Sequence, residues 1–265
     1  MGVLNVTPDS FSDGGRALDP GRAAALALEM EAAGADLLDI GAESTRPGAP
    51  PLPADEERAR LLPVLRRLRG QIAIPLSVDT YKADVARQAL DEGAVIVNDV
   101  SGLEYDPSLG DVVAARGAAL VLMHTRGRSS AMYQQAVYDD VVADVARELT
   151  RRVEAAMGRG VPWDSLILDP GIGFAKRAAE SARVLARFDA FAALGRPLLA
   201  GPSRKSFLSE AAGGRPAAER DWATAGAVAA AALAGAHIVR VHHVEAMAQV
   251  ARVADLLRAE SAGGA

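Results

Sequence analysis

Carboxylates, amides and cations recur along this chain directly after short apolar runs. The first such stretch, residues 5–15, carries an amide, hydroxyls and two carboxylates, and Pro8 and the pair Gly14-Gly15 exclude a regular element there. A single polar loop usually does no more than join two elements. Because similar glycine-bearing stretches follow nearly every later apolar run, the repetition indicates a site assembled from several loops.

Two acids and one amide form the first group of candidate site residues. Asp79, Asn98 and Asp169 each stand at the end of an apolar run. Carboxylates accept hydrogen bonds and an amide both donates and accepts, so the three together suit a flat heterocycle with an amino-pyrimidinone edge. Taken singly, each aspartate is as well explained as a cap or turn former, because Asp79 precedes a helical pattern and Asp169 precedes Pro-Gly.

Cations with hydroxyl and amide neighbours form a second group, expected opposite the acids. Its members are Asn5, Thr45, Arg46, Ser203, Lys205, Arg240 and His242. In a chain of net charge −5, cations at the ends of several runs indicate a local anion site. A hard cation held by Asn5 and bridging a phosphate fits this pattern, because magnesium takes few protein oxygens plus substrate phosphates. His124 also stands at a strand end, where a packed group and a site residue are equally good explanations.

Composition and spacing exclude several classes of protein. The net negative charge argues against nucleic acid as the main partner. Without cysteine there is no disulfide framework, thiolate catalysis or thiolate-bound metal. The start lacks the basic segment of a signal peptide, and the Ala-rich run 223–236 is shorter than the roughly 20 apolar residues that a membrane span needs. The glycines near Lys176 and Lys205 match neither the dinucleotide nor the Walker A pattern. We therefore expect a cytoplasmic protein whose partners are small molecules, not nucleic acid or membrane.

Short β-rich runs alternate with longer helical patterns from one end of the chain to the other. Strands are expected at residues 2–4, 36–40, 75–78, 95–97, 119–123, 166–168, 197–200 and 237–241. Helices are expected at residues 21–33, 55–69, 82–92, 108–115, 139–158, 180–193, 217–235 and 245–258. Short continuous apolar strands are typical of a parallel sheet that is buried on both faces.

This strict alternation predicts an α/β protein with a single (β/α)8 TIM barrel over residues 1–259 and a disordered C-terminal tail at residues 260–265. The alternative is a doubly wound Rossmann-type sheet, but no Gly-x-Gly-x-x-Gly follows the first strand. In such a barrel the active site lies at the C-terminal ends of the strands. Both groups of candidate residues stand there.

The motifs at these strand ends closely resemble those of the dihydropteroate synthase family. The matching segments are Asn5–Gly15, Gly41–Ala49, Ser77–Thr80, Asn98–Gly102, Met123-His124, Asp169–Phe174, Gly201–Phe207 and Arg240–His242. They span nearly the whole chain in the family's order, and the family fold is a (β/α)8 barrel. The resemblance implies a transferase of folate biosynthesis that joins 6-hydroxymethyl-7,8-dihydropterin pyrophosphate to para-aminobenzoate, giving dihydropteroate and pyrophosphate.

The resemblance also implies roles for individual residues. The pterin would be held by Asp79, Asn98, Asp169 and Lys205. The pyrophosphate would be held by Asn5, Thr45, Arg46, Arg240 and His242, with Mg²⁺ as the cofactor at Asn5. The para-aminobenzoate pocket would be lined by Phe11, Pro47, Phe174, Ser203 and Arg204. The catalytic set would be Asp169, Lys205, Arg240, His242 and Asp13, the last stabilising positive charge on the pterin.

The implied mechanism is dissociative: pyrophosphate leaves first, and the aniline nitrogen then attacks a cationic methylene group. Such a reaction depends on positioning and charge stabilisation, so the lack of an obvious nucleophile or catalytic dyad is expected. The family is the sulfonamide target, and its members are homodimers. In a homodimer the Ala-rich run 223–236 would face a twofold partner, although it is equally suited to packing on the barrel.

Four features depart from the family's pattern. Only four residues precede Asn5, where relatives carry a fuller first segment. Ala175 stands where glycine is usual, and Lys176 is followed by an unusual stretch at residues 177–180. His243 replaces an aspartate, which would either weaken the support of the preceding histidine or have no effect if it faces the outer helices.

Two other functions stay open at this point. A pterin-binding paralogue without turnover would keep Asp79, Asn98 and Asp169, but the intact first two loops and Lys205 argue against it. A barrel enzyme that hands a methyl group from methyl-tetrahydrofolate to a corrinoid partner would not need the stretch 45–47 or so many phosphate-directed cations.

Overall fold

The computed structural model describes residues 1–7, 19–44, 48–128 and 132–262. Six parallel strands form one sheet in chain order, and two shorter strands form a second parallel pair. The six are β1 (Gly2–Asn5), β2 (Leu38–Gly41), β3 (Leu76–Asp79), β4 (Ile96–Asp99), β5 (Ala119–Met123) and β6 (Leu166–Asp169), and the pair is β7 (Leu199–Ala200) and β8 (Ile238–Val239).

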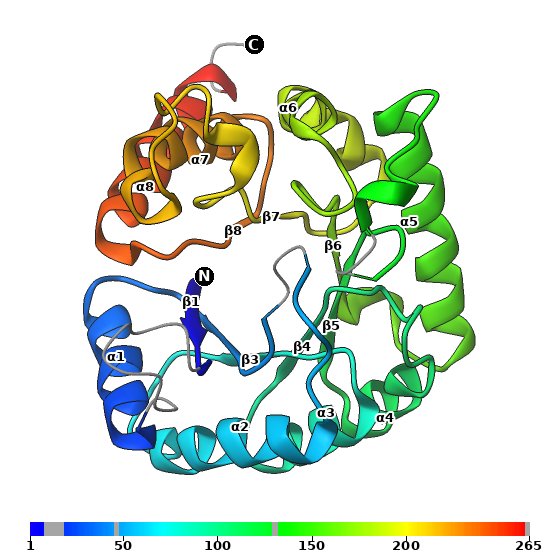
Figure 1. Cartoon of the computed structure of the whole chain (residues 1–265), viewed down its shortest axis with the longest axis vertical. Helices are drawn as coiled ribbons and strands as arrows, with labels where there is room; N and C mark the ends of the chain where they lie inside the picture. The colour runs from blue at the N-terminus through cyan, green and yellow to red at the C-terminus, as the bar shows by residue number, and fades with distance from the viewer. Residues whose placement is uncertain (8–18, 45–47, 129–131, 263–265) are drawn as a thin grey trace.

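Backbone contacts at two seams close these strands into a ring. Between β1 and β8, the Val3 amide donates to the Val241 carbonyl at 3.0 Å. Between β6 and β7, the Leu168 amide donates to the Pro197 carbonyl at 2.9 Å. Figure 1 shows the helices outside this ring. The (β/α)8 barrel predicted from the alternation of elements is therefore confirmed.

The α-helices follow the strands in turn. They are α1 (Pro20–Ala32), α2 (Ala54–Leu68), α3 (Ala83–Asp91), α4 (Ser108–Arg116), α5 (Val141–Gly158), α6 (Ala178–Ala186), α7 (Asp221–Leu233) and α8 (Val244–Ala262). None of the helices in the described ranges is both long and apolar enough to cross a membrane.

Three predictions of local structure need correction. The helix expected over residues 217–235 is shorter, since Ala217–Glu219 form a 3-10 helix and α7 begins at Asp221. The helix expected over residues 180–193 divides into α6 and a 3-10 helix (Phe188–Leu194), because the tighter turn places the buried Phe188 and Phe191 one above the other. The disordered tail expected from residue 260 is wrong for residues 260–262, since α8 continues to Ala262 and the Ser261 hydroxyl donates to the Leu257 carbonyl at 2.9 Å. Residues 263–265 lie outside the described part of the chain.

The strand register is what assembles polar groups at one end of the barrel. Asn5 lies beside Gly41, Gly41 beside Asp79, and Asp79 beside Asn98. These are the last or next-to-last residues of four consecutive strands. The apolar residues before them, such as Leu38, Ile40 and Val78, are buried and fill the layer behind. Packing of the strands thus presents the polar ends side by side.

Candidate active site

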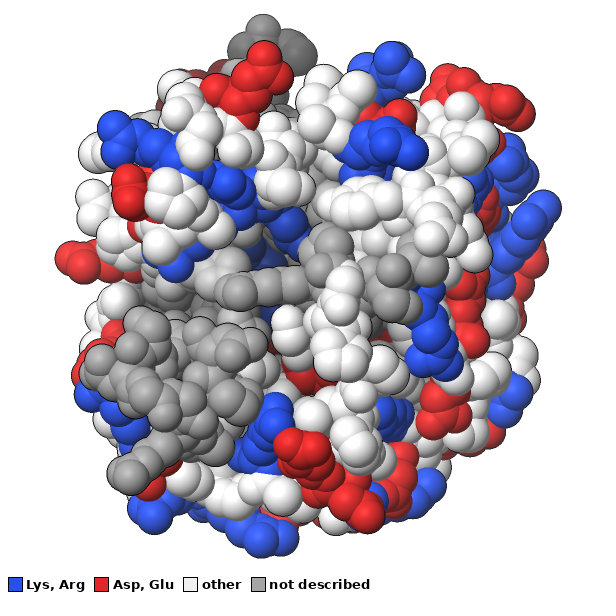
Figure 2. Space-filling view, viewed as in Figure 1, with Lys and Arg blue, Asp and Glu red and all other residues white. Residues whose placement is uncertain are grey.

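An ion-pair cluster centred on Arg240 occupies the C-terminal end of the barrel. The Arg240 Nε donates to Asp39 Oδ2 at 2.7 Å, and its Nη2 donates to Asp79 Oδ2 at 2.8 Å. The amide of Asn98 donates to the same Asp39 oxygen at 2.8 Å. The space-filling view has basic side chains inside the hollow over the centre of the barrel (Figure 2). One cation from the last strand therefore joins groups from β2, β3 and β4.

Asp39 is a member of this cluster that the sequence analysis missed. It lies in the middle of β2 and is fully buried between Leu38 and Ile40. Its Oδ1 atom is buried with no hydrogen-bond partner in the described ranges. The signal was a carboxylate inside an otherwise apolar strand: alternation sends its side chain to the face opposite that of its two neighbours, into the barrel.

The cations were expected opposite the acids, but the two groups do not lie on opposite sides of the site. Arg240 contacts two carboxylates directly, because a guanidinium taken out of water is stabilised by ion pairs in the same buried region. Asp79 is also not a helix cap. The first helical amide of α3, that of Ala83, is instead satisfied by Asp106 Oδ2 at 2.8 Å.

The sequence left open whether Asp169 is a turn former or a site residue, and in the structure it is placed to be both. Its Oδ1 accepts a hydrogen bond from the Gly171 amide at 2.7 Å, as a turn former does. The residue is also buried at the end of β6, and burial raises the pKa of its carboxyl to about 6 in spite of the Gly171 bond and the nearby lysines. Burial likewise raises the pKa of Asp79 to about 7, against the opposing charge of Arg240.

Lys205 stands at the start of the loop that follows β7, facing the β6 loop. Its Nζ lies 3.7 Å from the centre of the Phe174 ring, within the range of a cation–π contact. Burial and the charge of Arg240 lower the pKa of Lys205 to about 8, although Asp169 opposes the shift. Lys205 is thus brought close to Phe174 and Asp169, which belong to a different motif of the sequence.

Ser203 and His242 form a contact between the β7 and β8 loops. The Ser203 Oγ lies 2.9 Å from His242 Nδ1 and accepts from the His242 amide at 3.3 Å. Burial, followed by the charges of Arg240 and Arg204, lowers the pKa of His242 to about 3, so the ring is neutral near pH 7.

Arg204 points from this loop to the beginning of α7. Its guanidinium makes a two-pronged ion pair with Asp221, at 2.9 and 3.0 Å. The exposed His243 also contacts Asp221, with its Nδ1 3.0 Å from Oδ2. His243 therefore faces α7 rather than the neighbouring His242, in agreement with the second of the two outcomes expected for this departure.

Several predicted residues lie outside the described ranges: Phe11, Asp13, Thr45, Arg46 and Pro47. The base of the second loop is described. Glu43 contacts Lys82 Nζ and accepts from the Tyr81 hydroxyl at 3.0 Å, and Lys82 also pairs with the buried Glu57. No single sequence motif marks this anchor, because its members come from three different elements.

Asn5 is half-buried at the end of β1. It lies beside Gly41 on β2, and Gly41 in turn lies beside Asp79 on β3. Among the residues that the structure describes, no group of three or more His, Cys, Asp or Glu side chains is arranged to hold a metal alone. An amide oxygen at a strand end, in register with Gly41 and Asp79, fits a magnesium ion that takes most of its ligands from water and phosphate.

His124 is a packed group at the end of β5. It is fully buried, and its ring contacts Glu148 on one side and Lys176 on the other. Ala175, the second departure from the family's pattern, has a φ of 48°, a left-handed conformation that suits glycine better than alanine.

Comparisons with known proteins agree with this geometry. The pterin-binding enzyme family matches residues 1–242. The dihydropteroate synthase of Synechocystis sp. is 44% identical over 257 residues, which cover 97% of this chain and 89% of the relative. The chain belongs to the dihydropteroate synthase family. The members of this family are transferases of folate synthesis.

Solved structures of the family superpose closely on this chain. Dihydropteroate synthase from Xanthomonas albilineans is known with 4-aminobenzoic acid (TM-score 0.91, 43% identity) and with 7,8-dihydropteroate (TM-score 0.87, 41% identity), and each covers 97% of this chain and 92% of that one. The Yersinia pestis enzyme, in a sulfonamide drug complex, has a TM-score of 0.92 and 37% identity, covering 97% of this chain and 93% of its own.

The buried charge of Asp39 gives a direct test of the cluster. Asp39→Asn keeps the shape and the hydrogen-bond acceptor but removes one of the two charges that compensate Arg240. We expect the free energy of unfolding, measured with urea, to fall by about 2 kcal/mol, because a charge-assisted hydrogen bond is weakened while Asp79 remains as the counter-charge of Arg240. The same change at the exposed Asp36 should alter it by less than about 0.5 kcal/mol. Equal effects at the two positions would contradict the role given to Asp39.

Proposed function

We propose that this chain condenses 6-hydroxymethyl-7,8-dihydropterin pyrophosphate with para-aminobenzoate to give 7,8-dihydropteroate and pyrophosphate. The observation that carries the proposal is the convergence of Asp79, Asn98 and Asp169 with Lys205 and Arg240 at one end of the barrel. Carboxylates and an amide can match the N–H and carbonyl groups of a pterin edge. The relatives solved with 4-aminobenzoic acid and 7,8-dihydropteroate support the same substrates.

In this proposal the protein acts by positioning and charge stabilisation. Asp79, Asn98 and Asp169 hold the pterin, and the ammonium of Lys205 lies next to the ring of Phe174. Pyrophosphate leaves towards Arg240 and His242 before the aniline nitrogen attacks, and the buried carboxylates stabilise the positive charge that develops on the pterin. Phe174, Ser203 and Arg204 line the para-aminobenzoate side. Asp13, Thr45, Arg46, Phe11 and Pro47 keep the roles expected from the family resemblance.

We also propose Asn5 as the protein ligand of Mg²⁺. Its half-buried amide lies at the end of β1, and magnesium accepts one protein oxygen combined with substrate phosphates and water. When bound, the ion supplies positive charge that neutralises the departing pyrophosphate. The cytoplasmic location expected from the composition stays a prediction.

The decisive experiment measures pyrophosphate release from the dihydropterin substrate and magnesium, with and without para-aminobenzoate. We expect release that depends on para-aminobenzoate, with dihydropteroate as the product. Lys205→Ala and Asp169→Ala should each reduce kcat/KM by about a thousandfold or more, because each removes a charge that contacts the pterin. The same aspartate-to-alanine change at the exposed Asp189 is the control, and should leave kcat/KM unchanged.

Two outcomes would contradict this function. Pterin binding without pyrophosphate release would identify a paralogue without turnover. Tight binding of methyl-tetrahydrofolate would favour methyl transfer to a corrinoid partner. Full activity in either active-site variant would leave the enzyme assignment standing and remove that residue from the mechanism.

The shifted pKa values predict a bell-shaped dependence of kcat/KM on pH. Asp169 and Asp79, with pKa values raised to about 6 and about 7, must be ionised to accept N–H groups, so activity should rise through this range. Lys205, with its pKa lowered to about 8, loses its charge above that pH, so activity should then fall. In Lys205→Arg the guanidinium stays charged, and the alkaline limb should move beyond the measurable range. An unchanged alkaline limb in this variant would assign it to another group.

We further propose that the enzyme is a homodimer joined through α7 and α8. The apolar side chains of Leu233, Val253, Leu256 and Leu257 are 48 to 63% exposed on these two helices. Leu233, Val253 and Leu257 line a shared apolar groove that includes Ala229 and Val250. A contiguous apolar surface of this kind is typical of an isologous contact between two copies of one chain.

Light scattering after size-exclusion chromatography tests the dimer. The wild-type chain should have twice the mass of one chain, and Leu257→Glu should shift the population to monomers, because a carboxylate in an apolar contact loses its hydration. Val137→Glu introduces the same charge at an exposed valine far from α7 and α8 in sequence, and should leave the mass unchanged. A monomeric wild-type chain would overturn the dimer.

A further inference from the structure

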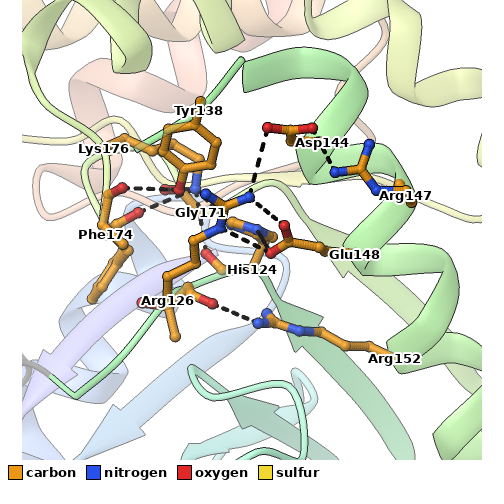
Figure 3. Close-up of polar contacts among 12 residues, drawn as sticks. His124, Arg126, Tyr138, Asp144, Arg147, Glu148, Arg152, Gly171, Phe174 and Lys176 are labelled. Atoms are coloured by element: carbon orange, nitrogen blue, oxygen red, sulfur yellow. Dashed lines mark hydrogen bonds and ion pairs between the residues drawn. The ribbon is translucent and has the colours of Figure 1, made fainter. Parts of the chain in front are cut away.

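A fully buried lysine lies directly behind the β6 loop of the site. Only 1% of Lys176 is exposed, and its Nζ lies 2.8 Å from His124 Nδ1 and 3.1 Å from the carbonyl oxygens of Gly171 and Phe174 (Figure 3). The Nζ also lies 3.5 Å from the His124 carbonyl oxygen, so it is surrounded by atoms to which an amine can donate. Burial lowers the pKa of Lys176 well below its ordinary value, with the charge of Asp169 opposing the shift, and the side chain can donate to the loop in either protonation state.

The imidazole of His124 connects this lysine to a carboxylate. Its Nε2 lies 2.9 Å from Glu148 Oε2, and an ionised carboxylate can only accept, so the ring proton is on Nε2 and Nδ1 accepts from Lys176. Burial, followed by the charge of Lys176, lowers the pKa of His124 to about 3, which keeps the ring neutral. Although burial alone would raise the pKa of Glu148, hydrogen bonds from His124 and Arg126 lower it.

Gly171 transmits this arrangement to the active site. Its carbonyl accepts from Lys176, while its amide donates to Asp169 Oδ1 at 2.7 Å. Its φ of 69° and the 1.9 Å that would separate an added Cβ from the His124 carbonyl oxygen leave no room for a side chain. A shift of the Gly171 peptide would therefore move the Asp169 carboxylate with it.

Phe174 is held from behind in the same way. Lys176 binds its carbonyl oxygen, its amide donates to the Gly171 carbonyl at 3.0 Å, and the front of its ring contacts Lys205. The next residue, Ala175, is held in its left-handed conformation with its carbonyl accepting from the Tyr138 hydroxyl at 2.9 Å. The loop is thus fixed by hydrogen bonds to its backbone from the side away from the substrate.

We propose that Lys176, supported by His124 and Glu148, is a positioning residue that holds Asp169 and Phe174 in the geometry that binds the two substrates. The chain Lys176–His124–Glu148 acts on the reaction without touching the reacting atoms. The imidazole of His124 contacts Lys176 on one side and the half-buried Glu148 on the other, so the lysine that holds the loop is itself held in place. This inference rests on the proposed function.

The test compares steady-state kinetics of Lys176→Met, Glu148→Gln and a control with those of the wild-type enzyme. Methionine fills the same space but cannot donate, so the KM values for both substrates should rise and kcat should fall, together lowering kcat/KM by about tenfold to a hundredfold, as a misplacement of about 1 Å does. Glu148→Gln keeps the shape and weakens only the support of His124, so it should change the same constants in the same direction by less.

Arg126→Gln is the matched control. Arg126 pairs with the same Glu148 from the other side, and its remaining hydrogen bond goes to the Val137 carbonyl. Its guanidinium also lies 3.7 Å from Asp144 Oδ2 and 4.0 Å from the centre of the Tyr138 ring, so in the described part of the chain it donates no hydrogen bond to the β6 loop backbone. We expect it to lower the melting temperature while both KM values stay within about twofold of wild type. If Lys176 had only a structural role, Lys176→Met would likewise lower the melting temperature and leave both KM values within about twofold of wild type.

Each outcome bears on the proposal. Wild-type constants in a folded Lys176→Met enzyme would overturn it, and so would equal changes in Arg126→Gln. If Lys176→Met does not fold, Glu148→Gln decides: raised KM values support positioning, and unchanged values overturn it. A wild-type enzyme without turnover would instead refute the proposed function, which separates the two failures.

Discussion

A guanidinium paired with two buried carboxylates is the interaction on which this barrel end depends. Arg240 comes from the last strand, whose regular part has only two residues, and reaches Asp39 and Asp79 on β2 and β3. Charges taken out of water are costly unless they are paired with good geometry. The pairing ties the residue that follows β8 to β2 and β3 across β1, and the Asn98 amide donates to the same Asp39 oxygen. One cation therefore fixes the positions of two acids, at an end of the barrel that backbone hydrogen bonds close.

Two lysines near the site, Lys82 and Lys176, are also held by polar partners inside the protein, but in different ways. Lys82 is compensated directly by Glu43 and Glu57 at the base of the second loop. Lys176 contacts no carboxylate directly in the part of the chain that the structure describes, and it is linked to Glu148 through His124. In both cases a lysine behind the site secures a loop at its base. A polar interior of this kind is costly for stability, and such costs are characteristic of functional ends of a scaffold.

Much of the fold and site could be predicted from the sequence for a geometric reason. In a parallel barrel the C-terminal ends of all strands meet, so polar residues after apolar runs converge whatever their separation along the chain. This rule found Asp79, Asn98, Asp169 and Lys205. It could not find Asp39, which lies inside a run and reaches the site by strand alternation. The same rule could not predict that Arg240 pairs with Asp39 and Asp79, since this depends on how far its side chain extends inside the barrel.

The β6 loop shows why it carries two glycines and a lysine although it matches no nucleotide-binding motif. Gly171 and Gly173 looked like an incomplete dinucleotide motif with Lys176 in place of the last glycine. Their actual constraint is contact: Gly171 lies against the His124 carbonyl, and an added Cβ on Gly173, at a φ of 80°, would lie 3.1 Å from Lys205 Cδ. Two lysines therefore approach the same short loop, one from the substrate side and one from behind. Glycine is required at both Gly171 and Gly173. With no side chain at Gly171, the Lys176 Nζ reaches the carbonyl oxygens of Gly171 and Phe174.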